Sequence, residues 1–535
     1  MLGWYRLNQL TLDLEADLAE IPRRISQTLQ VPLDLIGAYR IRRKSLDARG
    51  QRKPFFIMNI DFQWMGDLPT IQSLVSANSD LSPSLLPQNR PLLPGDQPLH
   101  HPPIVVGAGP AGLMAALRLA ESGYRPVLLE RGDGIRERVE AVEAFWRKGV
   151  LDPDSNIQFG AGGAGTFSDG KLTTRIKDPA ALEVLEILAG AGGSDEITYE
   201  AKAHIGTDRL RDLVTRLERR ILDAGGKVEY RTRVTGLILR DDRLVGIRLR
   251  DGSEIPTETL ILATGHSARE LYEELDRENI DLEPKPIAVG FRIEHPQALI
   301  DRSQYGRWAG HPRLGAADYK LTHHYTAGNR GVYSFCMCPG GVVVAAASEP
   351  ETVVTNGMSY YERNSGIANA AIVATVYPHE YGSEGPLAGL SFQRRWEQAA
   401  YQMGGGEYTA PGQLSRDYVE GRTGQSWGSL QPTYRPGVAC CDLNRLFPDF
   451  LNNAIRDGLK RFERLIPGFV AEGVLTGVET RTSAPLRITR RDDMQALRIE
   501  GLYPCGEGAG YAGGIVSAAV DGLHAAEAVI RKYHK

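Results

Sequence analysis

PIVVGAGPAGLMAALRLAESGYRPVLLERG, residues 103 to 132, is the stretch of this sequence that decides the fold. Its uncharged, β-branched start, Ile104 to Val106, predicts a buried parallel strand. The strand runs directly into a glycine turn of the pattern GxGxxG, and the leucines and alanines that follow predict a helix with an apolar side. A second short strand, Val127 to Leu129, completes a β-α-β unit that ends in Glu130.

The three glycines of this turn have different tasks. Gly107 permits the tight turn from strand to helix, Gly109 lets a pyrophosphate approach the backbone, and Gly112 lets the helix pack closely on the strand. The helix N-terminus, with its positive dipole end, points at the phosphates. Glu130 lies eighteen residues after Gly112. This is near the separation of roughly 20 at which a carboxylate accepts hydrogen bonds from a ribose, so the unit predicts a dinucleotide site.

The length and the charge of the chain narrow the class of protein. A chain of 535 residues is too long for one core, so two or three domains are expected. The net charge of −4 gives no general attraction for nucleic acid or an anionic membrane, and neither is expected as a partner. The N-terminal segment lacks the apolar run of a signal peptide, and the chain has no run long enough to span a membrane. Five cysteines agree with a reducing, cytoplasmic location, and they show no metal-ligand spacing.

Residues 1–66 are expected to form a small α/β module. Tyr5 to Leu14 and Phe55 to Phe62 alternate as strands, and Glu15 to Leu29 repeats its apolar residues at helical spacing. Seven basic residues lie between 40 and 53 with only Asp47 opposing them. They form either a site for RNA or another polyanion, or a solvated face. Residues 67–102, rich in proline and without periodicity, are expected to be a linker.

The first part of the dinucleotide domain is predicted to cover 103–282. It contains the glycine-dense loop NIQFGAGGAGTFSDGKL, residues 156 to 172. That loop also contains the pattern GxGxxG, but no buried strand precedes it and no apolar helix follows it. We therefore interpret it as a loop whose glycines let backbone amides approach a flat or charged ligand closely, rather than as a second dinucleotide site. Leu260 to Ala263 predicts a buried strand that returns to the same sheet.

The character of the chain changes after residue 282. Residues 283–475 alternate strand-like runs with loops rich in Gly, Tyr and His, and they show one clear helix, Leu451 to Leu465. We expect a substrate or cap domain here. Residues 476–535 then return to the dinucleotide domain with GLYPCGEGAGYAGGIVSAAVDGLHAAEAVI, residues 501 to 530, in which a glycine-rich turn opens a long Ala/Val helix.

The chain resembles the bacterial family of FAD-dependent dehydrogenases, or NAD(P)/FAD-dependent oxidoreductases. The resemblance rests on GAGPAG (107–112), LLERG (128–132), SNIQFGAGGAGTFSDGKL (155–172), LATGHSAR (262–269), SFCMCPGG (334–341), TNGMSYYERN (355–364) and PCGEGAGYAGGI (504–515). It implies an α/β fold, in which a Rossmann-like FAD-binding domain of glutathione-reductase type carries an inserted α+β substrate/cap domain and a small N-terminal α/β module. This sequence departs from the family at Ala161, where an acid is more usual.

The resemblance also implies which residues contact FAD. They are Gly107, Gly109, Pro110, Ala111, Gly112, Glu130, Arg131, Gly162, Gly163, Gly165, Thr166, Lys171, Val234, Thr264, Gly265, Gly506, Glu507, Gly513, Gly514 and Ile515. A helix that starts near Gly514 and points its positive end at the flavin pyrimidine would favour the anionic reduced flavin. Glu507 occupies the position where many flavin monooxygenases carry an aspartate. This difference makes a flavin monooxygenase function less expected for this chain.

Five residues are candidates for chemistry beyond the flavin. Cys336 and Cys338 are two positions apart on a predicted strand, so both thiols point to the same side of the strand. They are either a redox-active dithiol that faces the flavin or structural residues packed in the core. His266 is a candidate proton donor, because it lies in a motif near the cofactor. Tyr360 and Arg363 are candidates to clamp a carboxylate or polar substrate, with an exposed salt bridge as the alternative for Arg363.

These features favour an FAD-dependent oxidoreductase that moves a hydride between flavin N5 and a C–H or C=C bond of a small organic substrate. No second dinucleotide unit is present for NAD(P)H, so a nicotinamide would bind only transiently. Two alternatives stay open: an RNA-associated flavoprotein that uses the basic N-terminal module, and a flavin monooxygenase. The sequence does not identify the substrate, the electron partner or the oligomeric state.

Overall fold

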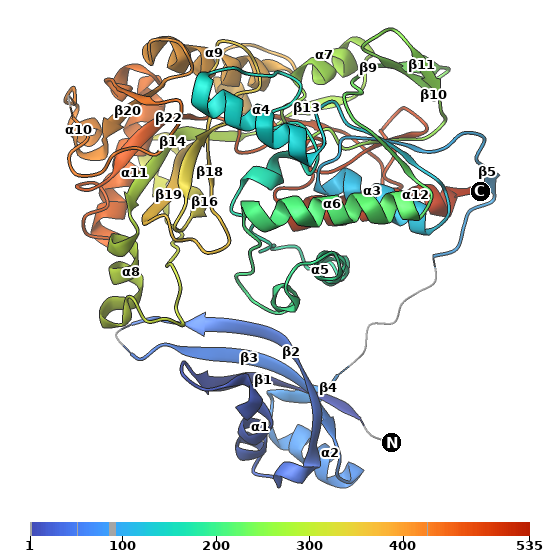
Figure 1. The fold of residues 1–535 in the computed structure, drawn as a ribbon, viewed down its shortest axis with the longest axis vertical. Coiled ribbons are helices and arrows are strands. Elements are labelled where there is room, and N and C mark those ends of the chain that lie inside the picture. The colour runs from blue at the N-terminus through green and yellow to red at the C-terminus, as the bar shows by residue number, and fades with distance from the viewer. Residues whose placement is uncertain (1–2, 51, 85–91, 425) are drawn as a thin grey trace.

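The computed structural model describes residues 3–50, 52–84, 92–424 and 426–535, which build three parts around β-sheets (Figure 1). A small N-terminal module lies at one end of the molecule. The rest of the chain forms a body from two domains. We call them the parallel-sheet domain (103–282 and 486–535) and the antiparallel-sheet domain (287–479), after the sheet that each contains.

The N-terminal module is a four-stranded antiparallel sheet whose two helices lie on the side away from the body (Figure 1). Residues alternate between buried and exposed along much of its first strand, as in a sheet with one solvated face. The first helix buries Ile21, Ile25 and Leu29 on one side. In the order β2-β3-β1-β4, the elements are β1 (Trp4–Asp13), β2 (Ile36–Asp47), β3 (Phe55–Trp64) and β4 (Leu81–Pro83), with α1 (Ile21–Leu29) and α2 (Leu68–Ala77).

The module extends past the predicted boundary at residue 66, because α2 and β4 lie in the segment expected to be a linker. Asp67 caps α2, its side chain accepting a hydrogen bond from Thr70 N at 2.9 Å. Pro69 lies in the first turn of the helix, where its missing N–H costs nothing. Proline content therefore misled the linker prediction over this part. Residues 85–91 of the expected linker lie outside the described residues.

The parallel-sheet domain contains five parallel strands in the order β24-β12-β6-β7-β8. The three strands on the β24 side are fully buried, which explains their uninterrupted apolar sequences. Residues after 500 thus complete a sheet begun at residue 104, as the sequence predicts. The strands are β6 (Ile104–Val106), β7 (Val127–Leu129), β8 (Lys227–Glu229), β12 (Leu260–Leu262) and β24 (Leu502–Pro504).

Helices and a small sheet surround these strands. The two helices packed most closely are α3 and α12, and a Cβ on Gly522 of α12 would lie 2.0 Å from the carbonyl oxygen of Ala111 on α3. The elements are α3 (Pro110–Glu121), α4 (Ile135–Lys148), α5 (Ala180–Gly190), α6 (Thr207–Asp223), α7 (Arg269–Arg277), α12 (Ile515–Lys532), β9 (Val234–Arg240), β10 (Arg243–Leu249), β11 (Glu254–Pro256) and the short pair β5 (Gln97–Pro98) and β25 (Tyr533–His534).

The antiparallel-sheet domain is built on seven strands in the order β15-β16-β19-β14-β22-β20-β21. Its elements are β14 (Ile287–Pro296), α8 (Gln297–Tyr305), β15 (Thr322–Tyr325), β16 (Arg330–Cys338), β17 (Val342–Ala345), β18 (Thr355–Met358), β19 (Ile367–Val376), α9 (Ala388–Met403), β20 (Ala410–Leu414), α10 (Ser415–Glu420), β21 (Val438–Cys440), α11 (Asp449–Leu465) and β22 (Val474–Glu479). Antiparallel β13 (Leu282–Pro284) and β23 (Leu486–Ile488) pair where the chain enters and leaves this domain.

Two predictions about this domain differ from the structure. Its sheet reaches Glu479 through β22, so the domain ends later than residue 475. The sequence showed only α11 clearly, whereas α8 and α9 are also present. Helix α9 was missed because its buried face includes Gln393 and Glu397, which interrupt the apolar repeat.

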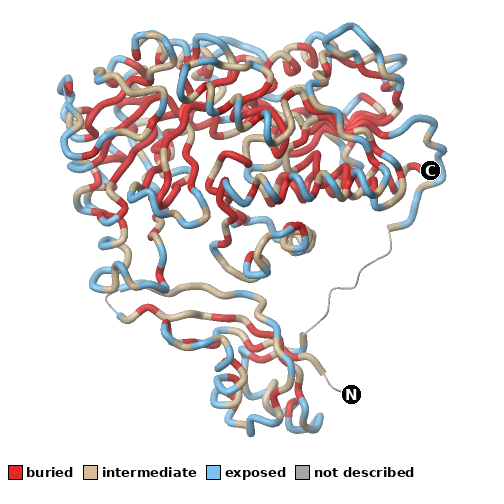
Figure 2. The backbone as a smooth tube through the Cα atoms, viewed as in Figure 1, coloured by how far each residue is buried: buried red, intermediate tan, exposed pale blue. Residues whose placement is uncertain are grey.

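Buried residues fill the interior of both domains of the body (Figure 2). The buried strands of both sheets and the facing sides of α3 and α12 contribute to it. The N-terminal module has a separate, smaller core. Among the described residues, the helices are all too short or too polar to cross a bilayer.

Candidate functional site

A cavity lies at the carboxyl edge of the parallel sheet, where open α/β sheets bind ligands. Glu130 follows β7 and Glu507 lies just beyond β24, and both line the cavity. Strands β6 and β12 lie between β7 and β24 in the sheet, so the lining extends over three strand spacings, about 14 Å. The glycine loop at 163–171 and segments of the antiparallel-sheet domain form the other walls.

The glycine turn after β6 has the geometry that its sequence predicts. Gly107 has φ +102°, and a Cβ there would lie 2.4 Å from the carbonyl oxygen of Ala263. A Cβ on Gly112 would lie 1.8 Å from the carbonyl oxygen of Gly107, so α3 approaches the turn too closely for any side chain. Gly109 differs, since a Cβ there would meet only Gly163 Cα, at 3.8 Å. Its open side faces the cavity.

Glu130 holds this turn and the glycine loop together. Its buried carboxylate accepts hydrogen bonds from Ala108 N at 2.8 Å and from Gly132 N and Gly160 N at 2.9 Å. A carboxylate has about four acceptor positions. Oε2, which accepts only from Ala108 N, therefore keeps one free acceptor position. A ribose hydroxyl could donate a hydrogen bond there.

Two helix N-termini face the cavity. Helix α3 begins at Pro110 with Gly109 as its cap residue, and α12 begins at Ile515 with Gly514 as its cap residue. All four residues line the cavity. Both positive dipole ends therefore favour an anionic group inside it.

Most of the residues assigned to the cofactor from the sequence line this one cavity. They are Gly107, Gly109, Pro110, Ala111, Glu130, Arg131, Gly163, Gly165, Lys171, Val234, Thr264, Gly265, Glu507, Gly514 and Ile515.

Five assigned residues lie outside the lining, and four of them have a clear structural task. Gly112 packs against the turn, and Gly162 lies against the Thr166 hydroxyl, which donates to the carbonyl oxygen of Ala161. Gly506 N donates to Asp521 at 2.6 Å. The fifth, Gly513, donates its N–H to Ser517 at the start of α12.

Cys336 lies on a β-bulge at the cavity wall. Phe335 pairs with Ala371 and Cys338 pairs with Asn369, so strand β16 has one residue more than β19 over this step. The bulge places Cys336 at φ +43°, a conformation that non-glycine residues rarely adopt. Cys336 is half-buried and lines the cavity, whereas Cys338 is fully buried behind it.

Positive charge surrounds the Cys336 thiol. The buried Arg292 guanidinium donates to the carbonyl oxygen of Cys336 at 3.2 Å, and Lys171 Nζ donates to that of Met337. A hydrogen bond from Cys338, together with the charges of Arg292 and Lys171, lowers the pKa of Cys336 to about 6, although burial opposes the shift. The same hydrogen bond and burial raise the pKa of Cys338. Cys336 is thus the more acidic thiol of the pair, while Cys338 Sγ also donates to the carbonyl oxygen of Cys336 at 3.3 Å.

Selective alkylation should reveal this thiolate. At pH 7 we expect iodoacetamide to modify Cys336 about tenfold faster than Cys440, although Cys440 is exposed, because burial raises the pKa of Cys440. Peptide mass spectrometry over a pH series measures both rates, and the Cys336 rate should reach half its maximum near pH 6. Replacing Cys338 by Ala, which removes the hydrogen-bond donor, should move that midpoint upward. Faster modification of Cys440 at pH 7 would contradict the assignment.

Two carboxyl groups in the cavity have unusually high pKa values. Burial raises the pKa of Glu479 to about 7, although Arg292 lies 3.6 Å from its carboxylate and Thr355 donates to it at 3.0 Å. Burial also raises the pKa of Glu507 to about 7. Near neutral pH both groups therefore exist in protonated and ionised forms, which is the property required of a general acid or base.

His266 lines the cavity, but its protonation differs from that of an ordinary proton donor. Burial, helped by the charges of Arg481 and Arg269, lowers the pKa of His266 to about 4. Its Nδ1 lies 3.0 Å from the Ser267 hydroxyl. The ring is therefore neutral at pH 7, and its remaining role is to donate or accept a hydrogen bond.

Arg363 and Tyr360 do not reach the cavity. The Arg363 guanidinium pairs with the buried Asp169, its Nε donating to Oδ1 at 2.9 Å. Asp169 lines the cavity and Arg363 lies behind it. The Tyr360 side chain is half exposed and lies outside the lining. The predicted clamp for a substrate carboxylate is thus an internal ion pair and a surface residue.

The sequence did not single out Glu479 or Phe335 as cavity residues, whereas Asn356 was a candidate to hold a polar substrate and does line the cavity. Each comes from a strand of the antiparallel-sheet domain and reaches the cavity only because that domain packs against the parallel sheet. Arg481 and Thr482, which directly follow β22, line it too. A buried acid at the end of an apolar strand, VLTGVE, was the available signal.

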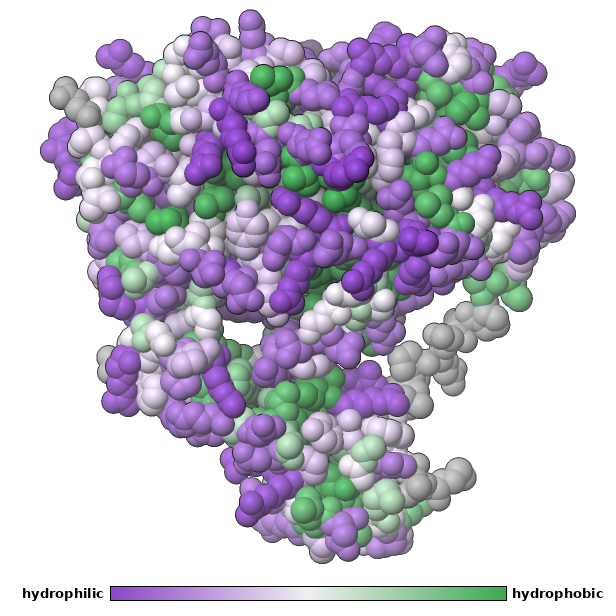
Figure 3. Space-filling model, viewed as in Figure 1, coloured by the Kyte–Doolittle hydropathy of each residue, from purple (hydrophilic) through white to green (hydrophobic). Residues whose placement is uncertain are grey.

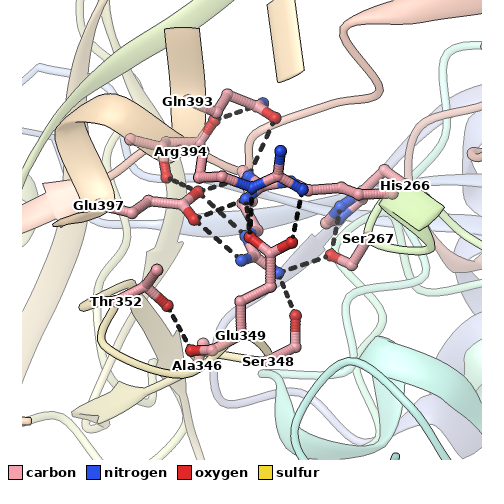
Figure 4. A network of polar contacts seen from close by, with 12 residues as sticks. His266, Ser267, Ala346, Ser348, Glu349, Thr352, Gln393, Arg394 and Glu397 are labelled. Carbon is pink, nitrogen blue, oxygen red and sulfur yellow. Dashed lines mark hydrogen bonds and ion pairs between the residues drawn. The ribbon is translucent and has the colours of Figure 1, made fainter. Parts of the chain in front are cut away.

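A buried ionic network joins the two domains beside the cavity (Figure 4). Glu397 of α9 accepts hydrogen bonds from Arg269 at 2.7 and 2.9 Å and from Arg481 at 2.9 and 3.1 Å. Glu349 adds a further carboxylate to Arg269. The two guanidinium groups hold the pKa of Glu397 far below its usual range despite full burial. Arg481 lines the cavity, so the network fixes one of its walls.

Family models match the chain in three parts. Residues 102–282 match pyridine nucleotide-disulphide oxidoreductase, and residues 286–482 match FAD-dependent protein, C-terminal domain-like. Residues 5–63 match a domain of unknown function, DUF8436. The first of these matches covers the first part of the parallel-sheet domain, and the second covers the antiparallel-sheet domain.

Two relatives and one solved structure illustrate the likeness. A Clostridium beijerinckii protein named "Uncharacterized protein" is 44% identical over 99% of this chain and 99% of its own. Digeranylgeranylglycerophospholipid reductase of Methanocella arvoryzae is 28% identical over 30% of this chain and 37% of its own. The crystal structure of CtdE in complex with FAD covers 78% of this chain and 81% of its own, at 13% identity and a TM-score of 0.29.

The fold and the matching family models define a flavin-dependent oxidoreductase. The chain belongs to the family of FAD-dependent oxidoreductases, and its cofactor is FAD. The residues present fit this cofactor, because Gly109 presents an open side that any Cβ would fill, and Glu130 retains an acceptor position.

Proposed function

We propose that this enzyme transfers a hydride between FAD and a C–H or C=C bond of a small organic substrate. The observation that carries the proposal is the pair of carboxyl groups with pKa values of about 7, Glu479 and Glu507, in the cavity wall. Moving a hydride to or from carbon leaves a proton to be supplied or removed. FAD, when bound, supplies hydride acceptance and donation at N5.

We further propose that the antiparallel-sheet domain acts as the substrate or cap domain of a glutathione-reductase-type flavoprotein. It contributes Phe335, Cys336 and Glu479 to the cavity. Phe335 is 37% exposed and offers an apolar surface to a substrate at the cavity mouth. Glu479 holds the proton within the same wall, with Thr355 and Arg292 fixing its carboxylate.

Anaerobic titration of the yellow holoprotein tests this proposal. We expect a small acid from a panel of candidates to reduce the yellow flavin through its C–H bond, or an alkene from the panel to reoxidise flavin that has first been reduced chemically, with the absorbance spectrum as readout. NADH and NADPH are titrated in parallel to find the electron donor. A flavin that reacts with nicotinamides and oxygen but with no organic substrate would contradict the proposal.

The pH dependence of that half-reaction tests the role of Glu479. For substrate oxidation the rate should rise with pH through about 7, because only the ionised carboxylate accepts a proton; for substrate reduction it should fall. Replacing Glu479 by Gln should flatten this profile and lower the rate by about 10²- to 10⁴-fold.

Glu507→Gln is the matched control, because Glu507 has a similar pKa and lines the same cavity. It should keep the break near pH 7. If the break survives in Glu479→Gln and disappears in Glu507→Gln, Glu507 is the proton carrier instead.

A further inference from the structure

A large cleft of about 2010 Å³ lies between the N-terminal module and the body. The module contacts the body at two places. Lys44 of β2 forms backbone hydrogen bonds with Tyr199 and Ala201, both at 2.8 Å, and its ammonium pairs with Glu200 at 2.6 Å. Elsewhere, Arg313 donates to the carbonyl oxygens of residues 14 and 16 of the module. These contacts hold the walls of the cleft in place.

The lining of this cleft is strongly basic, although the whole chain has a net charge of −4. It includes twelve Lys and Arg side chains against four Asp and Glu. Where the module faces the body, hydrophilic residues lie beside apolar ones (Figure 3). The sequence shows the basic residues of β2, but it does not show that other basic segments lie opposite them.

Eight of these twelve cations have no acidic partner among the described residues, and two of the eight, Lys171 and Arg313, donate to backbone carbonyl oxygens instead. Among the described residues, no carboxylate lies within 4.0 Å of the charged group of Arg43, Arg175, Arg209, Arg302, Arg307 or Lys320. All six side chains are exposed. They come from four separate segments, namely β2, the loop before α5, the start of α6 and the stretch from α8 to residue 320. Their charges therefore converge on the cleft rather than on one another.

Aromatic rings lie among these cations. Arg209 covers the ring of Tyr361 at 3.2 Å, and Tyr361 stacks on His204 at 5.3 Å. Trp308 lies beside Arg307, at 5.4 Å. A cleft that joins positive charges with aromatic faces and guanidinium planes can hold phosphates and stack unpaired bases.

We propose that this cleft binds single-stranded nucleic acid through its phosphate backbone. The cleft is larger than the roughly 300–1,000 Å³ of an ordinary small-molecule site, and its unpaired cations are spread along it as an extended polyanion requires. The aromatic groups favour unpaired bases over a duplex, whose bases are already stacked, and over an acidic peptide. This proposal does not rest on the hydride-transfer function.

The cleft also opens toward the flavin cavity. Lys171, Phe335 and Cys336 line both, so they form the boundary between the two spaces. Phe335 is exposed at this boundary. A strand held in the cleft thus passes the mouth of the cavity.

Fluorescence anisotropy of the full-length holoprotein with labelled RNA tests the proposal. We use a single strand of roughly 10 nucleotides, an equal DNA strand and poly-glutamate. Replacing Arg307 and Lys320 together by Glu should weaken RNA binding at least about tenfold. Because each lost phosphate contact reduces the salt dependence, the slope of log K against log salt should fall by about 1.4.

The matched control replaces Lys227 and Arg240 by Glu, a pair of exposed cations on β8 and β9 outside the cleft. It changes the net charge equally and should leave affinity within about twofold. FAD content, which should be unchanged in both variants, reports folding. RNA preference over DNA, or equal binding of both, supports the proposal. Absence of salt-dependent binding to either strand, equal losses in both variants, or equally tight binding of poly-glutamate overturns it.

Discussion

Purified Gly109→Trp protein should be colourless. A Cβ at Gly109 meets no protein atom closer than 3.8 Å, and the backbone, at φ −79° and ψ −176°, accepts any residue. The indole therefore extends into the cavity instead of disturbing the turn. Because it occupies the space that a pyrophosphate needs next to the backbone, FAD affinity should fall by about 2–3 kcal/mol or more, at least roughly 30-fold.

The flavin absorbance per protein chain measures this loss, and thermal unfolding of the apoprotein shows whether the fold survives. Gly190→Trp is the matched control. Gly190 also has open space around its Cβ position, and it lies outside the cavity. An unchanged flavin content in Gly109→Trp would contradict the position of the cofactor.

The dinucleotide half of the site could be predicted because its determinants are local. Turn, helix and acid follow one another within 103–132, and each glycine has a backbone reason that the spacing already implies. The return of the chain to the same sheet through β12 and β24 was also visible as short apolar runs that end in glycine. Such runs are typical of buried parallel strands.

The positions of the candidate catalytic residues in the cavity could not be predicted in the same way, because they depend on the pairing of strands that are distant in the sequence. Glu479 reaches the cavity through the register that places it opposite Gly290. Cys336 reaches it through a bulge, whereas the sequence indicated a regular strand with both thiols on one face. Neither register nor bulge leaves a signal in the local pattern.

The elevated pKa of Glu479 illustrates the same limit. It results from burial, which only the packed domains create. Conversely, the sequence motif around His266 indicated a proton donor. In the structure, burial beside two guanidinium groups lowers the pKa of His266, so its ring is neutral at pH 7. Residue type gives the possible chemistry of a site, and packing decides its protonation.

Glu397→Gln should destabilise the protein by about 3–5 kcal/mol, because removing one partner of a buried ionic group leaves the others uncompensated. Arg269 and Arg481 are both buried, and each directs two hydrogen bonds at the Glu397 carboxylate. Glutamine keeps the shape but neither the charge nor the second acceptor oxygen. Urea unfolding followed by tryptophan fluorescence measures the change. Glu420→Gln, which removes an exposed partner of Arg422, should cost at most about 1 kcal/mol.

The pH dependence separates this ionic effect from a packing defect. The folded protein lowers the pKa of Glu397 from its ordinary value of 4.5, so the ionic stabilisation is complete above that pH and is lost as pH falls through the lower, folded-state pKa. The difference between wild type and Glu397→Gln should therefore shrink in acid. A packing defect would cost the same at every pH. Since Arg481 lines the flavin cavity, FAD affinity should fall in the same variant, which would tie the buried network to the site.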